Sequence, residues 1–149
     1  MKKLFLALCV LVVLLSCSSH SDNEYFSYDY LKNDFGQVAV VAHVDAQEVN
    51  MVDSIGEGAT GYVRYLIRGH VIEPFKGEVK SNQALEYYSV AEKGYNPANY
   101  RGNKIVFLNK VFDKQKKEWV LSELENSARP ASKAIISKMR KIKEQTEDK

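Results

Sequence analysis

The sequence predicts a mainly β fold: a small closed barrel of five strands, with a short N-terminal helix and a C-terminal amphipathic helix. Three observations predict it. Runs rich in Val, Ile, Tyr and Phe are separated by stretches that contain glycine, proline and polar residues. The longest run carries a central glycine, Gly69, which indicates a bulge that bends the strand. After Pro130 the apolar residues recur every three or four positions, which is typical of a helix.

The first residues have the layout of an export signal. Met1-Lys2-Lys3 precedes a run from Leu4 to Leu15 that is apolar throughout and contains one cysteine. A helix of about twelve residues rises about 18 Å, which is short of the roughly 30 Å hydrocarbon core of a bilayer. We therefore expect residues 1–16 to be a cleaved signal peptide and not a permanent transmembrane helix.

Leu14-Leu15-Ser16-Cys17 ends this run and resembles the lipobox of bacterial lipoproteins. The resemblance implies signal cleavage between Ser16 and Cys17, a diacylglyceryl group on the Cys17 thiol and an acyl chain on the new amine. Several acyl chains anchor a protein stably, whereas one chain gives only marginal attachment. The lipid bilayer is thus the first expected partner. The alternative is a chance cysteine after an ordinary secretory signal.

The residue after the lipobox cysteine bears on location. In enterobacterial lipoproteins an aspartate at that position retains the protein in the inner membrane. Ser18 and Ser19 stand there in this chain. The resemblance therefore implies a cell-envelope protein, with the outer membrane favoured over the inner membrane if the cell has one.

Composition limits what the rest of the chain can be. Removal of residues 1–16 leaves 133 of the 149 residues, enough for one domain with a single core. Lys2 and Lys3 leave with the signal, so 19 basic and 19 acidic side chains balance in the mature chain. This balance argues against a nucleic-acid partner. With Cys9 removed and Cys17 acylated, no internal disulfide can form, and the domain must depend on packing.

Residues 17–23 are predicted to be a lipidated tether, because they are small and polar and have little to bury. The domain then occupies residues 24–149. Residues 24–35 mix aromatic and acidic side chains and predict a short helix that packs its aromatic rings under the domain. An aromatic contact with the membrane surface is the alternative, but the acids at Glu24, Asp29 and Asp34 oppose anionic lipid.

Five strands are predicted in the domain. They cover residues 37–46, 62–75, 83–91, 104–112 and 117–123. Because side chains alternate between the two faces of a strand, every second residue of the first predicted strand lies on one face, and the same holds for the second predicted strand. These are Val38, Val40, Ala42 and Val44 in the first strand, and Val63, Tyr65, Ile67 and Val71 in the second. Residues 47–61 and 92–103 are predicted to be loops.

A C-terminal helix is predicted for residues 130–146, with Pro130 in its first turn. Its apolar face is formed by residues at spacings of four, four and three, namely Ala131, Ile135, Met139 and Ile142. The other face is basic. It carries Lys133, Lys138, Arg140, Lys141 and Lys143, and it is either a solvated surface or a binding surface.

A closed barrel of five short strands is commonly an oligonucleotide/oligosaccharide-binding (OB) barrel. Three segments, 35–44, 65–77 and 100–108, also resemble netrin-like domains, the family that includes the tissue inhibitors of metalloproteinases. The resemblance covers about Phe35 to Glu123 and implies an OB barrel, not a site. Those inhibitors chelate the protease zinc through a free N-terminal cysteine. An acylated Cys17 cannot do this, so that mechanism is not implied.

No motif predicts catalysis. Residues 56–61 spell GxGxxG, but a strand-like run follows them instead of a helix, so we interpret them as a hairpin loop. His43 and His70 lie on neighbouring predicted strands, but a zinc site would also need Asp45 or Glu73, and a pair of ordinary surface or partly buried histidines is the favoured interpretation. The chain has no Gly-x-Ser-x-Gly elbow and no free thiol. The acidic pair Glu123 and Glu125 is interpreted as exposed.

Tyrosines are the main candidates for recognition. Tyr62, Tyr95 and Tyr100 lie in or beside the predicted loops, and tyrosine is enriched at binding surfaces because it combines contact area with a polar tip. The alternative is that they fill barrel walls. The sequence thus predicts a noncatalytic binding module for a protein or an envelope component, without metal or cofactor. A protease inhibitor that acts through a loop is the alternative function.

Overall fold

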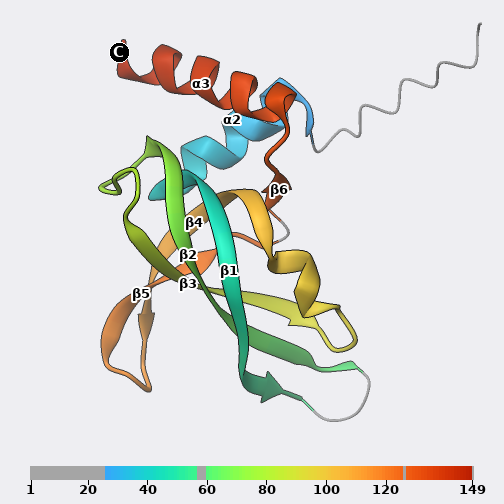
Figure 1. The fold of residues 1–149 in the computed structure, drawn as a ribbon. Coiled ribbons are helices and arrows are strands. Elements are labelled where there is room, and N and C mark those ends of the chain that lie inside the picture. The colour runs from blue at the N-terminus through green and yellow to red at the C-terminus, as the bar shows by residue number, and fades with distance from the viewer. Residues whose placement is uncertain (1–25, 57–59, 126, 149) are drawn as a thin grey trace, which may run out of the picture.

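The computed structural model describes residues 26–56, 60–125 and 127–148 (Figure 1). The predicted signal peptide, Cys17 and the tether lie outside the described residues. The fold is mainly β, with one helix near the N-terminus and one at the C-terminus, as predicted. The elements are α2 (Tyr28–Gln37), β1 (Val40–Ile55), β2 (Tyr62–Lys76), β3 (Ala84–Glu92), η3 (Pro97–Tyr100), β4 (Gly102–Asp113), β5 (Glu118–Glu123), β6 (Arg129–Pro130) and α3 (Lys133–Glu147).

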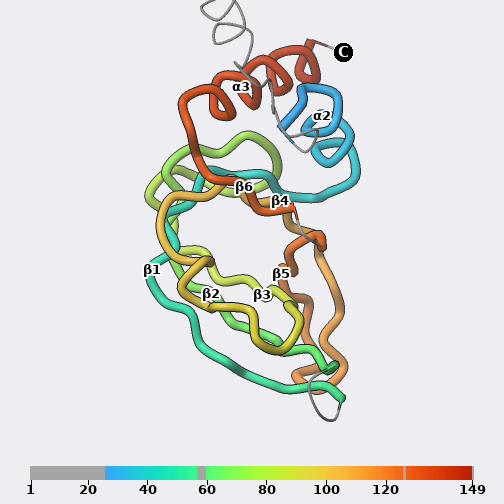
Figure 2. Tube along the Cα trace, turned by 90° about the vertical axis from the view of Figure 1, so that its right-hand side faces the viewer, coloured from blue at the N-terminus to red at the C-terminus, as the bar shows by residue number. Residues whose placement is uncertain are grey.

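Five strands pair into a ring. Their order is β1-β2-β3-β5-β4, and a further pairing of β1 with β4 closes the circuit (Figure 2). Every pairing is antiparallel except that of β3 with β5, which is parallel and consists of one residue pair, Tyr88 with Ser122. The ring therefore has one thin seam, between β3 and β5.

The ring encloses the larger of two hydrophobic cores. Alternate residues of the strands point into it, as the period-two pattern of β1 and β2 predicts. The buried members are Val40, Ala42, Val44, Ala46, Val63, Tyr65, Ile67, Val71, Leu85, Tyr87, Tyr100, Val106 and Leu108. Burial of these residues against one another is the main force that holds the strands in a ring.

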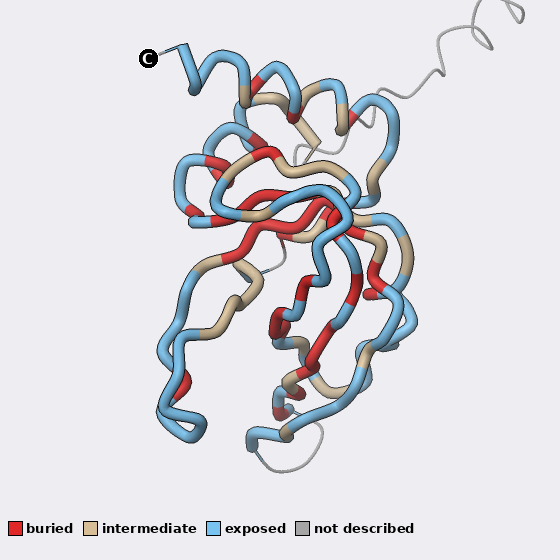
Figure 3. Tube along the Cα trace, turned by 60° about the vertical axis from the view of Figure 1, so that its left-hand side comes forward, coloured by how far each residue is buried: buried red, intermediate tan, exposed pale blue. Residues whose placement is uncertain are grey.

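The second core lies between the ring and the two helices. The opposite faces of β1 and β4 pack there, which explains why both strands read as continuous apolar runs. The buried members are Leu31, Phe35, Val38, Val41, Phe75, Ile105, Phe107, Ile135, Met139 and Ile142. Figure 3 shows buried segments under the helices, whereas the end of the ring away from the helices is largely exposed.

The helix boundaries differ from the predicted ones because serines cap both helices. Ser27 Oγ accepts a hydrogen bond from the Tyr30 backbone N–H at 3.2 Å, so α2 begins after Ser27. Ser132 Oγ likewise accepts from the Ile135 N–H at 3.3 Å. The prediction that Pro130 lies in the first turn of the C-terminal helix is wrong, because Pro130 belongs to β6 and pairs with Lys104. The predicted apolar face of this helix is confirmed by Ile135, Met139 and Ile142.

The predicted loop 47–61 is wrong for residues 47–55. Strand β1 continues to Ile55 and remains paired with β2 as far as Tyr62. Most side chains in this extension are exposed, so the alternation of buried and exposed residues that identifies a half-buried strand is missing there. What joins the two strands is a short hairpin connection after Ile55, which includes the ends of the GxGxxG string, Gly56 and Gly61.

Gly69 lies at the predicted irregularity, but the extra residue is in β1. The register shifts between Ala46, which pairs with Gly69, and Glu48, which pairs with Arg68. A Cβ atom on Gly69 would stand 2.1 Å from the Asp45 carbonyl oxygen, so any side chain would force the two backbones apart. The close crossing of β1 and β2 therefore requires glycine at this position.

We expect Gly69→Ala to lower the free energy of unfolding by at least about 1 kcal/mol, because the new methyl group overpacks the crossing of β1 and β2. Urea denaturation at neutral pH measures it. Gly36→Ala in α2 is the matched control, since no atom lies within 4 Å of its added Cβ and alanine favours a helix. An equal response of the two variants would contradict the close approach at Gly69.

Candidate functional site

A pocket of about 730 Å³ lies beside the seam of the ring. Beyond the Tyr88–Ser122 pair, β3 continues to Glu92, while β5 ends at Glu123. The space between them is bordered by the β1–β2 hairpin, by η3 and by the start of β4. We call this site the tyrosine pocket, after four of its lining residues, Tyr62, Tyr87, Tyr95 and Tyr100.

All three tyrosines predicted as a binding surface line this pocket, although they come from separate segments. Tyr62 begins β2, Tyr95 follows β3, and Tyr100 ends η3. Tyr62 and Tyr95 are 48% and 41% exposed, whereas Tyr100 is 8% exposed. Tyr62 and Tyr95 can therefore contact a ligand with a large part of their rings. Tyr100 is mainly a wall residue, as the alternative interpretation held.

Local sequence explains how Tyr100 is held. Asn96 caps η3, and its Oδ1 accepts a hydrogen bond from the Ala98 N–H at 3.0 Å. Pro97 occupies the first turn, where its fixed φ suits the helical backbone. This turn places the Tyr100 ring 5.1 Å from the Tyr95 ring and 5.5 Å from the Tyr65 ring, centroid to centroid. The aromatic wall of the pocket is thus rigidly supported from the core.

The inner wall carries hydroxyl groups. Ser89 Oγ donates a hydrogen bond to the Tyr100 hydroxyl at 3.0 Å. Burial raises the pKa of Tyr100 to about 12, and it raises the pKa of Tyr87, which is almost fully buried, even further above its usual range. Both phenols therefore keep their protons near neutral pH and can act as hydrogen-bond donors.

Glu123 is the pocket residue whose burial the sequence did not predict. The prediction that it is exposed is wrong for its carboxyl: Oε1 accepts a hydrogen bond from the Ala128 N–H at 3.1 Å, and Oε2 is shielded from solvent. Oε2 has no hydrogen-bond partner in the part of the chain that the structure describes. Burial raises the pKa of Glu123, against the opposing effects of the Ser89 hydroxyl, the Ala128 N–H and the positive charges of Arg129 and Lys104.

The charge of the lining is unequal. Three carboxyl groups, those of Glu92, Glu123 and Glu125, line the pocket, and Lys104 is the one cationic residue among its described lining. The lining contains tyrosines, a serine and an asparagine as uncharged polar residues, and neither histidine nor cysteine. The pocket is therefore an acidic, aromatic site.

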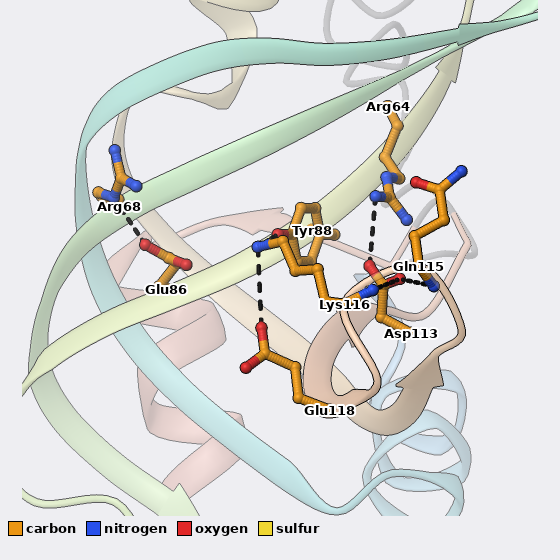
Figure 4. A network of polar contacts seen from close by, with 8 residues as sticks. All are labelled: Arg64, Arg68, Glu86, Tyr88, Asp113, Gln115, Lys116 and Glu118. Carbon is orange, nitrogen blue, oxygen red and sulfur yellow. Dashed lines mark hydrogen bonds and ion pairs between the residues drawn. The ribbon is translucent and has the colours of Figure 1, made fainter.

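Polar contacts outside the lining of the tyrosine pocket hold β3 and the β4–β5 turn together near the seam (Figure 4). Arg64 of β2 contacts the Asp113 carboxylate at 3.3 Å, and its guanidinium lies 4.7 Å from the centre of the Tyr88 ring of β3. The Lys116 ammonium donates to the Tyr88 hydroxyl. Asp113 also accepts from the N–H groups of Gln115 and Lys116, which lower its pKa. These contacts tie the β4–β5 turn to β2 and β3 where backbone pairing is thin.

The histidines do not converge as a zinc site would require. On the β1–β2 ladder His43 lies opposite Glu73, and His70 lies opposite Asp45. Within the described ranges, no three His, Cys, Asp or Glu side chains group closely enough to hold a metal ion. Burial lowers the pKa of His43, which makes its neutral form more stable.

One further feature was not anticipated. Phe112 and Trp119 are exposed on the β4–β5 hairpin and pack edge to face, with ring centroids 5.6 Å apart.

The described helices are all too short or too polar to cross a bilayer. A comparison of this chain with models of known families, with curated proteins and with solved structures finds no match in any of the three.

Proposed function

We propose that this chain is a lipid-anchored protein of the cell envelope whose β domain is a noncatalytic binding module, with the tyrosine pocket as its ligand site. The observation that carries the proposal is the convergence of three separate segments on one pocket that contains a buried carboxyl oxygen without a hydrogen-bond partner in the described part of the chain. Its volume of about 730 Å³ is in the range of small-molecule sites. Partly exposed Tyr62 and Tyr95 supply contact area at its mouth.

The chemistry of the lining favours binding over catalysis. Tyr87 and Tyr100 keep their protons near neutral pH because burial raises the pKa of both, which makes them poor bases. The serine in the wall, Ser89, donates its hydrogen bond to a tyrosine and is not activated by a histidine. These groups are suited to orient a ligand.

The domain architecture belongs to the same proposal. We infer a netrin-like OB barrel, on two grounds. The ring order β1-β2-β3-β5-β4, closed by β1 with β4, supports a five-stranded OB arrangement. The resemblance of residues 35–44, 65–77 and 100–108 to netrin-like domains supports the family.

The binding site is tested by photo-crosslinking in the native envelope. A photoreactive phenylalanine placed at Tyr95 should crosslink a discrete partner or ligand of the envelope, because this side chain is at the mouth of the tyrosine pocket. The same probe placed at Trp119 is the matched control, since Trp119 is an exposed aromatic residue outside the pocket. Crosslinks of equal yield from both positions, or from Trp119 alone, would overturn the assignment of the pocket.

The anchor is tested separately. We expect Cys17→Ser to move the protein from the membrane fraction to the soluble fraction, because each buried methylene of an acyl chain contributes about 0.8 kcal/mol to attachment. Cys9→Ser, which changes the other cysteine inside the predicted signal, should leave the protein membrane-bound and acylated. Fractionation with mass spectrometry of the mature N-terminus measures both. A Cys17→Ser protein that stays in the membrane would refute lipid attachment at this position.

A further inference from the structure

We propose that the tyrosine pocket binds a small organic cation, a molecule with a protonated amino group on an apolar or aromatic body. This inference rests on the proposed function, because it names the ligand class of the same pocket. It follows from three properties of the lining as far as the structure describes it: an acceptor without a donor, an excess of carboxyl groups, and aromatic faces at the mouth.

The first property is the Glu123 carboxyl. Its Oε1 accepts from the Ala128 N–H. The Ser89 hydroxyl lies close enough to the carboxyl to lower its pKa, but it donates its hydrogen bond to Tyr100, and Oε2 has no hydrogen-bond partner among the described residues. A buried polar atom left without a partner destabilises the folded protein, and more so if it is charged. Proteins rarely keep such atoms unless a ligand, ion or water completes them. An ammonium group carries three donors and a positive charge, so it satisfies this oxygen in both respects.

The second property is charge. Glu92 and Glu125 line the same pocket as Glu123, whereas Lys104 is the one cationic side chain in its described lining. Arg129 lies near Glu123 but is engaged with Asp34, 3.6 Å away. The net field in the pocket therefore attracts cations and repels anions. A carboxylate or phosphate ligand would have to overcome three acidic neighbours with one lysine.

The third property is aromatic. Tyr62 and Tyr95 expose large parts of their rings at the mouth, and Tyr100 backs Tyr95 from the core. A cation over a tyrosine face is attracted by the ring, and the attraction strengthens as the site excludes water. Ile55, Val90 and Ala91 also line the pocket and offer apolar contact for the body of the ligand. The lining thus matches a molecule with a charged end and an apolar end.

The test uses three probes of similar size that differ in charge: phenethylammonium, 2-phenylethanol and 3-phenylpropanoate. Binding to the full chain in detergent micelles is measured by calorimetry, with NMR of the tyrosine rings to locate the probe. We expect phenethylammonium to bind at least tenfold more tightly than the alcohol and the anion to bind most weakly. We expect it to shift the Tyr95 and Tyr100 resonances. Equal affinity for ammonium and alcohol, or a preference for the anion, would overturn the inference.

Variants decide which residues are responsible. Glu123→Gln keeps the shape of the side chain and removes its charge, and it should reduce the preference for ammonium over alcohol at least tenfold without weakening the alcohol. Glu78→Gln, an exposed acid outside the pocket, is the matched control and should change nothing. Tyr95→Ala, which removes a partly exposed ring, should weaken phenethylammonium by about fivefold through loss of the cation–π contact. Full retention of the preference in Glu123→Gln would refute the role of this carboxyl.

The two proposals fail in different ways. If the neutral or anionic probe binds at Tyr95 and Tyr100 more tightly than the cation, the ligand class is wrong and the tyrosine pocket remains the binding site. If no probe perturbs these rings and the photoreactive residue at Tyr95 captures nothing, the pocket itself is wrong. In that case both proposals are overturned.

Discussion

Replacement of Arg129 by methionine should lower the free energy of unfolding by about 3–5 kcal/mol. Arg129 and Asp34 are 5% and 6% exposed, and their charged groups lie 3.6 Å apart. Arg129 also places its guanidinium 5.8 Å from the centre of the Tyr30 ring. The pair joins β6 to α2, so its arginine holds the helical layer to the ring. Methionine keeps much of the apolar stem but leaves the Asp34 carboxylate buried without its cation.

The pH dependence of this loss has a defined sign. Burial raises the pKa of Asp34, and the Arg129 charge opposes that rise. Without Arg129 the folded-state pKa of Asp34 rises further above its unfolded value. A carboxyl with a raised pKa stabilises the fold only where it is protonated, and this contribution is lost as the pH rises through the folded-state pKa. The defect of Arg129→Met should therefore be largest near pH 7 and shrink as the pH falls toward about 4.

Urea denaturation at several pH values measures the effect, and two variants control it. Arg140→Met removes a guanidinium that binds Glu73 through two hydrogen bonds of 2.9 Å but is 60% exposed, so its loss should be much smaller. The double variant Asp34→Asn with Arg129→Met should recover a large part of the lost stability, since it removes the Asp34 charge that Arg129 no longer compensates. Equal losses in Arg129→Met and Arg140→Met would show that burial of the pair contributes nothing.

Local sequence patterns predicted the elements whose burial follows a simple period. The alternating residues of β2 and the three-and-four spacing of α3 each bury the side chains they predicted. The pattern fails where burial is absent. Residues 47–55 of β1 are strand because they pair with β2, not because they face a core, so nothing in their own sequence distinguishes them from a loop. Strand β6 is two residues long and gives no period at all.

The candidate site was only half predictable, for a related reason. Tyr62, Tyr95 and Tyr100 could be selected by residue type alone, because tyrosine is enriched at binding surfaces. Glu123 was missed because its burial depends on the parallel pairing of β5 with β3, a long-range contact that no local pattern encodes. The strand period gave one indication that Glu123 is buried. Leu121 packs against the inner core, and the strand period of two puts Glu123 on the same side of β5.

Glu123→Gln should raise the free energy of unfolding by about 1–3 kcal/mol at pH 7, a gain in stability from the loss of an acid. Burial raises the pKa of Glu123 above its unfolded value, so this carboxyl lowers the stability of the folded state at any pH above the unfolded pKa, pH 7 included. Near it, Arg129, Lys104, the Ser89 hydroxyl and the Ala128 N–H reduce this cost without removing it. Glutamine can accept the same Ala128 hydrogen bond and has no charge to bury.

The stability gain of Glu123→Gln should depend on pH with a defined sign. Because a raised pKa favours the protonated folded state, wild-type stability should fall as the pH rises from the unfolded pKa, about 4.3, through the folded-state pKa. The Glu123→Gln protein lacks this group, so its advantage in urea denaturation should vanish below about pH 4 and grow above it. Glu78→Gln, at an exposed position, should show no such dependence. A Glu123→Gln protein that is less stable than wild type at pH 7 would mean that the carboxylate is satisfied within the fold.

A gain in stability together with a loss of ammonium binding would show that the Glu123 carboxyl lowers the stability of the fold and also recognises the ligand. A buried carboxylate that weakens the fold persists most readily where its charge is needed for a ligand, since activity often requires a locally destabilised site. Phenethylammonium should accordingly stabilise wild-type protein against urea and leave Glu123→Gln almost unchanged, because a ligand that binds the folded state stabilises it by an amount that grows with the ratio of its concentration to its Kd. Equal stabilisation of both proteins by this probe would separate the buried charge of Glu123 from recognition and leave its cost to the fold without a functional reason.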